Sequence, residues 1–461
     1  MGERAGAAVA FHMKVYGCQM NVYDSDRVRT ALIRRGWREV ASDEEAELVV
    51  FTGCSVRAKA EQKVWSELGR YEAAWKKRRR PTVALTGCIA QSRGEAGTET
   101  LGHRALSRFP WVRLVSGPRH IGLLPDALAR VMGDPRLRLD LLDVDAREIF
   151  ELEEAGLARE SRCRAYVTIA HGCDNFCSYC IVPHVRGRFA SRPAEDVLRE
   201  VRALVEDGAR EITLLGQNVN SWGKDLADGS SFASLLRRVA RVDGLWRVRF
   251  VTSLPQDFGP DIVAVMAEEP TVCPSLDLPI QSGSDRVLKL MNRKYSRAEY
   301  MEKVEMVRAA LPELGLGTDL IVGFPGEGEE DFEASVSALE EIRFDRVHSA
   351  AYSERAGTPA ATMPGSLPRE VRLARLARLN AVQDAITLEI NAALVGRTFP
   401  VLVDSVAPKG LAPDGAPLLQ GRTPTDKQTI FPGDASLIGQ IIDVRIVRAE
   451  AWCLHGEIVE A

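Results

Sequence analysis

Three cysteines stand within eight residues of one another, at Cys173, Cys177 and Cys180. Cysteine thiolates are ligands of zinc and of iron–sulfur clusters, and a loop this short can curl around one metal centre. A structural zinc ion would need a fourth ligand, for which His171 and His184 are the nearest candidates. Three thiolates on a four-iron cluster instead leave one iron open to a substrate. The C-x3-C-x2-C spacing therefore favours an iron–sulfur cluster, with zinc as the alternative.

Three more cysteines share a local pattern near the N-terminus: an apolar run, a glycine, the cysteine and then a helical pattern. They are Cys18, Cys54 and Cys88, separated by 36 and 34 residues, which suits a strand, a helix and their turns. Because the carboxyl ends of parallel strands meet at one crevice, we expect these cysteines to converge there. The glycine before each cysteine lets the backbone come close to a bulky inorganic group. The alternative is a set of three inert core cysteines.

From Arg164 onward the sequence alternates between short apolar runs and amphipathic segments. Helical periodicity is clear at Ala194–Asp207 and Arg297–Leu311. Six such units predict a parallel, partly closed β/α barrel, whose chemistry lies at the carboxyl ends of its strands. The loop that begins at Cys173 follows the first strand. The predicted strands are Ala165–Ala170, Glu211–Leu215, Arg247–Thr252, Ser275–Leu278, Gly317–Val322 and Arg346–Ala351.

These elements predict an α/β protein with three domains. An N-terminal open parallel α/β sheet domain covers residues 12–133, a central partial (β/α)6 barrel covers residues 160–392, and a small antiparallel β-barrel covers residues 393–461. Residues 134–160 are charged and weakly periodic, which predicts a connector. The segment Arg369–Leu394 has leucines on one face and arginines on another, which predicts an amphipathic helix with a solvated basic face.

Composition narrows the class of protein. A chain of 461 residues that is 45% hydrophobic folds around a large core rather than staying disordered. The net charge of -4 argues against a nucleic-acid coat, but 60 Lys and Arg residues suffice for one local RNA-binding face. No signal peptide or membrane span is visible, so we expect a cytoplasmic monomer with no membrane partner. In that reducing compartment the nine cysteines are not expected to form disulfides.

The C-x3-C-x2-C loop resembles the signature of the radical S-adenosylmethionine superfamily. The wider sequence, from about Lys14 to the C-terminus, resembles the tRNA methylthiotransferases, and within them the branch that acts on N6-isopentenyladenosine. Cys163, Cys273 and Cys453 match no ligand position of the family and are interpreted as incidental. The matching stretches are Tyr16–Asn21, Gly172–Arg192, Leu215–Asn220, Leu278–Lys294 and Thr318–Glu327.

This resemblance implies two 4Fe-4S clusters. Cys173, Cys177 and Cys180 would bind the radical-generating cluster. S-adenosylmethionine would serve as methyl donor and as radical source, with an external electron donor and a sulfur source. The reaction implied is insertion of a methylthio group at C2 of N6-isopentenyladenosine next to the anticodon in tRNA. The auxiliary cluster would be bound by Cys18, Cys54 and Cys88.

Contacts to S-adenosylmethionine follow from position in the barrel. Tyr179 would lie beside the adenine, and Gln217, Ser253 and Gln281 follow the second, third and fourth strands. These polar groups would orient the cofactor. The alternative is that each one caps a strand end.

The closing β-barrel corresponds in this family to a TRAM domain, an RNA-binding module, and Gln420–Lys427 resembles its turn. Arg422 and Lys427 would then contact phosphates of the tRNA anticodon arm. Arg186 and Arg188, next to the cluster loop, are further candidate RNA contacts, with solvated charge as the alternative.

Two other functions remain open at this point. A sister methylthiotransferase would act on N6-threonylcarbamoyladenosine in tRNA or on an aspartate of a ribosomal protein. A different class would be a non-catalytic, metal-containing RNA-binding protein.

Overall fold

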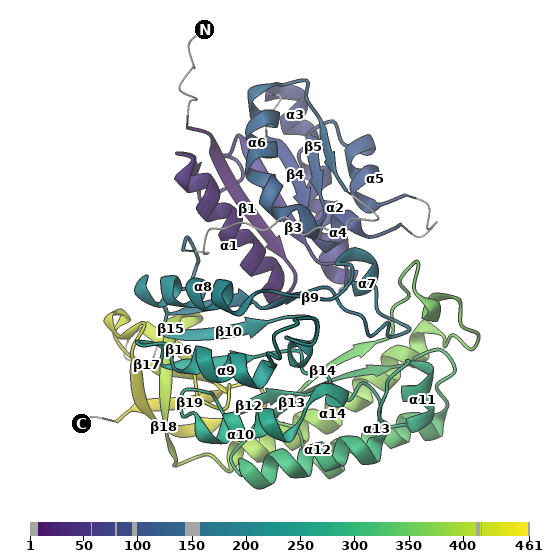
Figure 1. Ribbon diagram of the computed structural model, residues 1–461, viewed down its shortest axis with the longest axis vertical. Helices are drawn as coiled ribbons and strands as arrows, with labels where there is room; N and C mark the ends of the chain where they lie inside the picture. Colours follow the sequence, from purple (N-terminus) through teal and green to yellow (C-terminus); the bar gives the residue numbers. More distant parts are fainter. Residues whose placement is uncertain are drawn as a thin grey trace. The chain divides into compact units, whose positions relative to one another are not determined.

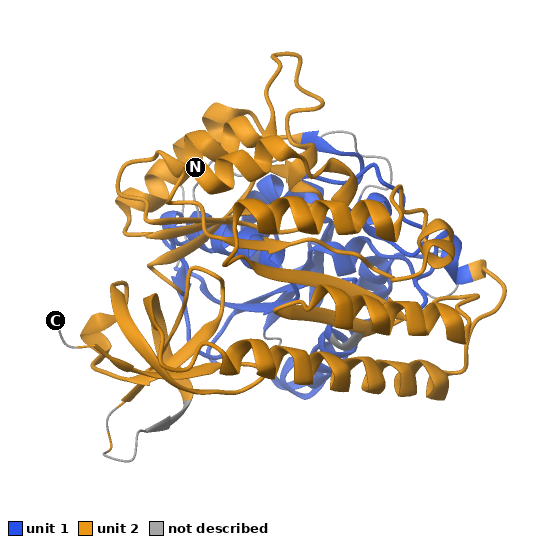
Figure 2. Cartoon of the chain, turned by 90° about the horizontal axis from the view of Figure 1, so that it is seen from below, with its two compact units in different colours: residues 1–160, 171–190, 353–361 blue, residues 161–170, 191–352, 362–461 orange. Residues whose placement is uncertain are grey.

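The computed structural model describes residues 8–56, 58–78, 81–94, 99–142, 157–411, 415 and 417–459. The chain forms two compact units (Figure 2). Unit 1 comprises residues 1–160, 171–190 and 353–361, and unit 2 comprises residues 161–170, 191–352 and 362–461. This division follows packing, whereas the three predicted domains follow the order of elements along the sequence. The loop with Cys173 packs within unit 1, and the C-terminal barrel packs in the same unit as the central strands.

Unit 1 contains the predicted open parallel sheet, with strand order β2-β1-β3-β4-β5-β6 (Figure 1). Every neighbouring pair is parallel. The strands are β1 (Ala10–Tyr16), β2 (Arg38–Glu39), β3 (Leu48–Gly53), β4 (Thr82–Thr86), β5 (Val112–Ser116) and β6 (Leu139–Leu141). The last of these corrects the prediction of a plain connector at residues 134–160, because a three-residue edge strand is too short to show periodicity. Residues 143–156 of that segment lie outside the described residues.

Helices cover both faces of this sheet. α1 (Gln19–Arg34) and α6 (Leu124–Gly133) pack on one face, and α2 (Ala58–Arg70) and α5 (Leu101–Arg108) pack on the other. The central strands are therefore buried on both sides, which explains why they are apolar without alternation. The shorter helices of this unit are α3 (Glu72–Arg78), α4 (Cys88–Gln91) and α7 (Val182–Val185).

Unit 2 contains the six predicted barrel strands as two parallel three-stranded sheets, β11-β10-β7 and β12-β13-β14. β10 and β14 have the predicted bounds, and the ends of the other four lie within two residues of prediction. The strands are β7 (Arg164–Thr168), β10 (Glu211–Leu215), β11 (Arg247–Phe250), β12 (Ser275–Asp277), β13 (Gly315–Val322) and β14 (Arg346–Ala351). The helices are α8 (Ala194–Glu206), α9 (Phe232–Ala240), α10 (Pro260–Glu268), α11 (Asp285–Leu290), α12 (Arg297–Ala310), α13 (Glu329–Ile342) and α14 (Arg369–Ala392). Two short strands, β8 (Ala170–His171) and β9 (Ala190–Ser191), complete the central part of the chain.

A closed five-stranded barrel follows α14, with strand order β15-β16-β17-β19-β18. The pairs are antiparallel except β17 with β19, which is parallel. The prediction of a fully antiparallel barrel is corrected in this respect, because a closed ring with an odd number of strands must contain at least one parallel pair. The strands are β15 (Thr398–Leu411), β16 (Pro417–Arg422), β17 (Gln428–Pro432), β18 (Ile441–Ala449) and β19 (Leu454–Ile458). Among the described residues, no helix is long and apolar enough to cross a bilayer.

Candidate metal centres

The structure brings Cys18, Cys54 and Cys88 together at one end of the sheet in unit 1. They directly follow the neighbouring strands β1, β3 and β4, whose register pairs Tyr16 with Gly53 and Thr52 with Thr86. The three strands therefore end side by side. The thiol of Cys54 hydrogen-bonds to Cys18, and Cys88 lies close enough to influence the charge of both. The predicted convergence of the strand ends is present.

The glycines before these cysteines let the strand ends approach one another. A Cβ atom on Gly17 would lie 2.5 Å from the Cβ of Cys54. Gly87 has a φ of +88°, and a Cβ there would lie 2.9 Å from the carbonyl oxygen of Gly53. Glycine before each cysteine therefore does mark a close approach. In the structure, this approach is between neighbouring strand ends of the chain, whereas the prediction was an approach to an inorganic group.

The pKa values of the three thiols are shifted in different directions. The hydrogen bond from Cys54 lowers the pKa of Cys18 to about 5, and the nearby Arg186 charge acts in the same direction. Cys54, as the partner in that hydrogen bond and itself buried, has a raised pKa. Burial also raises the pKa of Cys88. A thiolate at Cys18 reduces the cost of metal binding, because ligand thiols must lose their protons.

Arg186 joins this group from a distant part of the sequence. Its Nε donates to Sγ of Cys88 at 3.1 Å, and its Nη2 donates to Oδ2 of Asp24 at 3.2 Å. Although burial opposes its charge, Cys88 and Asp24 raise the pKa of Arg186 further above its usual value. The residue is only 3% exposed. This corrects the prediction that Arg186 contacts RNA, because its guanidinium is enclosed by protein.

Cys173, Cys177 and Cys180 lie in a loop that is fixed by local hydrogen bonds. The backbone N–H of Cys173 donates to Gly187 at 3.1 Å, and that of Cys180 donates to Cys177 at 2.9 Å. Cys173 is buried, and the other two are half-buried. The loop thus leaves part of its thiol surface accessible.

The exposed Arg188 stabilises this loop through contacts with two of its side chains. Its guanidinium makes two hydrogen bonds to the carboxylate of Asp174, at 2.7 and 3.1 Å, and lies over the ring of Phe176. The side chain is still 75% exposed. A contact between Arg188 and RNA stays a prediction.

The two cysteine trios are neighbours within unit 1. Ile181, which directly follows Cys180, packs with Val185 against Cys88. Arg186 stands at the end of α7, which begins just after Ile181. The same short segment therefore carries the last cysteine of one trio and contacts a cysteine of the other.

Neither cysteine trio has all of its donor atoms within 4.8 Å of one another. Within the described ranges, the one group of three or more His, Cys, Asp or Glu residues with all donor atoms within 4.8 Å is elsewhere, at Glu450, Cys453 and His455. A cube of four irons needs its thiolates at separate corners, so the spread suits a cluster.

A cavity of about 520 Å³ lies beside both trios in unit 1. Ser55 and Ile181, which line it, directly follow Cys54 and Cys180. Its size is within the range of small-molecule sites. Basic and aromatic side chains form much of its wall, namely Trp65, Arg93, Arg104, Arg108 and Arg355. These residues share no motif in the sequence, because they come from α2, α5 and separate loops, and they were not predicted.

Three of the four residues predicted to contact S-adenosylmethionine follow strands of unit 2. Gln217 is half-buried after β10, and Ser253 is fully buried after β11, where its hydroxyl donates to Asn220 at 3.2 Å. Gln281 follows β12 with a φ of +69°, and its backbone N–H donates to Asp319 at 2.9 Å. Each therefore stands at the carboxyl end of its strand. Tyr179 is half-buried in the cysteine loop of unit 1. Their role toward the cofactor stays a prediction.

Arg422 and Lys427 contact carboxylates of the chain itself. Lys427 Nζ donates to Asp345 at 2.6 Å and to Asn391 at 2.9 Å, and its side chain is 11% exposed. Arg422 pairs with Asp426 at 3.0 Å and is 31% exposed. The structure thus uses both cations to hold the turn in place, and a phosphate contact stays a prediction chiefly for the more exposed Arg422.

Asp426 is the centre of the contact between the small barrel and the central strands of unit 2. It pairs with Arg346 at 2.7 Å and faces Arg249, whose guanidinium also donates to the carbonyl of Thr423 at 2.8 Å. Although burial would raise the pKa of Asp426, Arg422, Arg249 and Arg346 hold it well below its usual range. The turn is therefore attached through a buried charge cluster.

Asp426→Asn should lower the free energy of unfolding by about 3 kcal/mol at pH 7, because it leaves buried arginines without their anion. Since the folded-state pKa is depressed, the wild-type contribution is fully present above the unfolded-state value of about 4 and is lost as pH falls below it. Urea unfolding at pH 7, 5 and 3 checks this. The loss of unfolding free energy in Asp426→Asn, relative to the wild type, should be equal at pH 7 and pH 5 and smaller at pH 3. The exposed Asp443→Asn is the matched control, and an equal deficit in both variants would contradict the expectation.

The basic face of α14 was predicted to be solvated, and for Arg375 this is wrong. Its Nη1 donates to Glu327 at 2.7 Å and its Nη2 to Glu329 at 2.9 Å, and the residue is 8% exposed. Glu327 in turn accepts from the backbone N–H of Gly323 at 2.7 Å. The helix therefore fixes the loop after β13, one of the strands that carry the site.

Comparison with protein families adds independent information. Residues 10–106 match an uncharacterized protein family, UPF0004, residues 167–339 match the radical SAM superfamily, and residues 392–459 match the TRAM domain. The order agrees with the three predicted domains.

Similar curated proteins span the whole chain. A tRNA-2-methylthio-N(6)-dimethylallyladenosine synthase of Moorella thermoacetica is 44% identical over 454 residues, which are 98% of this chain and 99% of the relative. The protein of the same name from Nitratidesulfovibrio vulgaris is 44% identical over 451 residues, 97% of this chain and 98% of that one.

Among solved structures, the radical S-adenosylmethionine methyltransferase TsrM of Kitasatospora setae is similar in fold, with a TM-score of 0.54. The match covers 77% of this chain and 74% of that one at 16% identity. At this low identity the match supports the fold of the chain, and it carries no conclusion about function.

Proposed function

This chain belongs to the family of tRNA-2-methylthio-N(6)-dimethylallyladenosine synthases, and from that membership we propose that it inserts a methylthio group at C2 of N6-isopentenyladenosine next to the anticodon of tRNA. It is a radical S-adenosylmethionine enzyme with a TRAM domain. The observation that carries the proposal is the adjacency of two cysteine trios in one unit, joined through Ile181 and Arg186. One trio alone would serve radical generation, and sulfur insertion calls for a second centre.

The donor sets fit two four-iron clusters. Cys173, Cys177 and Cys180 lie on a short loop in which the last two are half-buried, which suits a cluster that must also bind S-adenosylmethionine. When bound, the two clusters supply the electron that cleaves S-adenosylmethionine and the sulfur that is inserted.

The other trio suits an enclosed auxiliary cluster. Cys54 and Cys88 are buried, and Cys18 favours its thiolate form. The task of the surrounding residues is to hold the thiolates, keep water away and orient the cofactor. Gln217, Ser253 and Gln281, which follow strands of unit 2, would do the last of these.

The cavity beside the trios supports the choice of an RNA substrate. Four arginines against two glutamates give its wall a positive balance, and the guanidinium of Arg104 lies 5.5 Å from the ring centre of Trp65. Cationic and aromatic groups of this kind suit phosphates and unstacked bases. A base in an anticodon loop is partly unstacked, so its presentation to the site costs little. The enzyme would work in the cytoplasm as a monomer, with an external electron donor and sulfur source.

Nucleoside analysis of tRNA from a deletion strain tests the substrate. We expect the 2-methylthio-N6-isopentenyladenosine peak to disappear and N6-isopentenyladenosine to accumulate, with restoration by the wild-type gene. An unchanged peak would reject the proposal. Loss of 2-methylthio-N6-threonylcarbamoyladenosine, or of the methylthio group on a ribosomal aspartate, would assign the chain to a sister activity. If purified and reconstituted protein held zinc and no iron, a non-catalytic RNA-binding role would replace it.

A further inference from the structure

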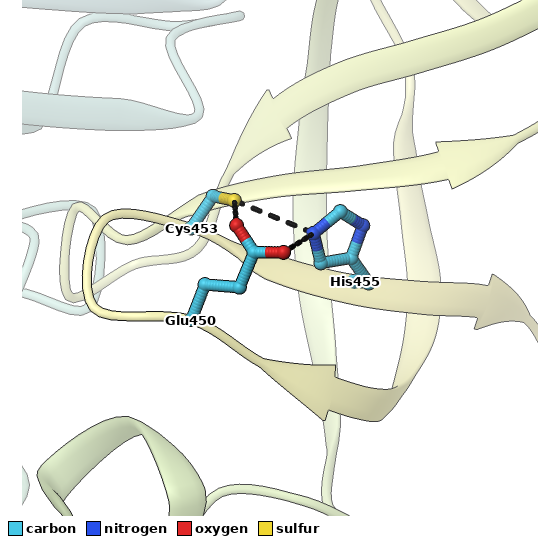
Figure 3. A group of neighbouring side chains, drawn as sticks. All are labelled: Glu450, Cys453 and His455. Atoms are coloured by element: carbon cyan, nitrogen blue, oxygen red, sulfur yellow. Dashed lines mark hydrogen bonds and ion pairs between the residues drawn. The ribbon is translucent and has the colours of Figure 1, made fainter. Parts of the chain in front are cut away.

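Three side chains with different donor atoms meet at the hairpin between β18 and β19, far along the sequence from the six cluster cysteines. Figure 3 shows Glu450, Cys453 and His455 turned toward one another. Sγ of Cys453 lies 3.5 Å from Nε2 of His455 and 3.6 Å from Oε2 of Glu450. Nε2 of His455 lies 3.3 Å from Oε1 of Glu450. The sulfur, the ring nitrogen and the carboxylate, whose two oxygens each face one of these neighbours, thus form a small triangle on the surface of the barrel, and one donor atom from each residue lies within 4.8 Å of the other two.

The sides of this triangle are close to the ligand separations of a zinc site, which the Glu450 carboxylate completes by turning one oxygen toward both neighbours. Bonds of about 2.3 Å to sulfur and about 2.0 to 2.1 Å to nitrogen and oxygen, at tetrahedral angles, place sulfur about 3.6 Å from the other donors. The same bonds place nitrogen and oxygen about 3.3 Å apart. We propose that Glu450, Cys453 and His455 bind one zinc ion, with a fourth position left for water.

The backbone holds the three donors in place without a metal. The N–H of Glu450 donates to the carbonyl of Cys453 at 2.9 Å, which closes the turn. Cys453 and His455 are two residues apart along an extended segment, so their side chains share one face. From α14, the amide of Asn391 donates to the carbonyls of Glu450 and Ala451, at 2.8 and 3.2 Å. A site on fixed elements loses little entropy when the ion binds.

The donor chemistry also selects zinc among the common divalent ions. One thiolate, one imidazole and one carboxylate suit a borderline-soft ion, whereas magnesium and calcium prefer sites built from oxygen alone. Arg448 forms an ion pair with Glu450 and competes with the metal for that carboxylate. Because Arg448 is largely exposed, its side chain can leave into solvent.

The test uses the full chain with both clusters reconstituted under anaerobic conditions. Titration of Zn2+ against a chromophoric chelator should reveal one zinc ion per chain, with a dissociation constant of about 1 µM or lower. Cys453→Ser and His455→Asn should each weaken it at least about 10-fold. Cys163→Ser removes a cysteine outside all three groups, and Glu457→Gln removes a half-exposed glutamate of β19. Both controls should bind zinc as the wild type does.

Zinc K-edge absorption distinguishes the proposed site from misplaced zinc. One sulfur neighbour with two or three nitrogen or oxygen neighbours is expected. A spectrum with three sulfur neighbours would place the ion on vacated cluster cysteines and overturn the proposal. Equal affinity in Cys453→Ser and the wild type, or absence of binding to a folded wild-type chain, would overturn it as well. Thermal unfolding without metal should be unchanged in the two site variants, which shows that lost binding is not lost folding.

Discussion

Cys177→Ala is expected to abolish formation of 5′-deoxyadenosine, whereas Cys54→Ala should retain it and lose methylthio transfer to tRNA. Cys177 belongs to the half-buried loop that is proposed to hold the S-adenosylmethionine-binding cluster. Without this thiolate the electron source is lost, and cleavage should fall at least about 1,000-fold toward the uncatalysed rate. Cys54 is buried and belongs to the trio at the ends of β1, β3 and β4. Its own backbone N–H donates to the carbonyl of Tyr16 at the strand ends.

Chromatography of deoxyadenosine and of digested tRNA, from single-turnover reactions with dithionite, measures the two outcomes separately. Cys163→Ser serves as the cysteine control and should behave as the wild type. Cys163 lies in unit 2, where its Sγ is near the carbonyl of Val403, whereas both cysteine trios lie in unit 1. If Cys177→Ala and Cys54→Ala lost cleavage to the same degree, the proposed division of labour between the trios would be wrong.

Arg186→Ala should remove the proposed auxiliary cluster while sparing the radical-generating one. The substitution leaves Asp24 buried without its cation and removes the donor to Cys88, which should cost about 3 to 5 kcal/mol of folding free energy. After reconstitution the iron content should fall from about eight to about four per chain. Where a cluster is retained, loss of the positive charge should lower its reduction potential by the order of 100 mV. Iron analysis and potentiometric electron paramagnetic resonance measure both effects.

Arg186→Lys separates charge from geometry. Lysine keeps the positive charge but lacks the planar fork that reaches Cys88 and Asp24 together, so the potential should be largely restored and the stability only partly. Arg130→Ala, an exposed arginine on α6 of the same unit, is the matched control. An unchanged potential and full iron content in Arg186→Ala would show that the guanidinium has no part in this site.

The zinc proposal gives Cys453 a role that sequence comparison did not. The cysteine matches no ligand position of the family, and nothing in the spacing of Glu450, Cys453 and His455 distinguishes it from incidental polar residues. Only the closed turn and the bond from Asn391 fix the triangle.

The sequence by itself determined what depends on local order. The spacing of Cys173, Cys177 and Cys180 predicts a metal-binding loop, because residues this close in sequence can reach one compact centre. Short apolar runs between amphipathic helical segments located the barrel strands within two residues, since burial imposes these patterns directly on the sequence. The repeated unit of apolar run, glycine and cysteine predicted that Cys18 and its counterparts meet, because parallel strands present their carboxyl ends at one edge.

The tertiary structure decided which charges are buried and what they pair with. Arg186, Arg375 and Lys427 are indistinguishable in sequence from solvated cations. The structure places them beside Cys88, Glu327 and Asp345, at separations of 48 to 98 residues. A charged residue carries no periodic signal of its own burial, because the partner that compensates its desolvation can come from any part of the chain. For the same reason the basic wall of the cavity beside the trios emerged only when α2, α5 and their neighbouring loops were folded together.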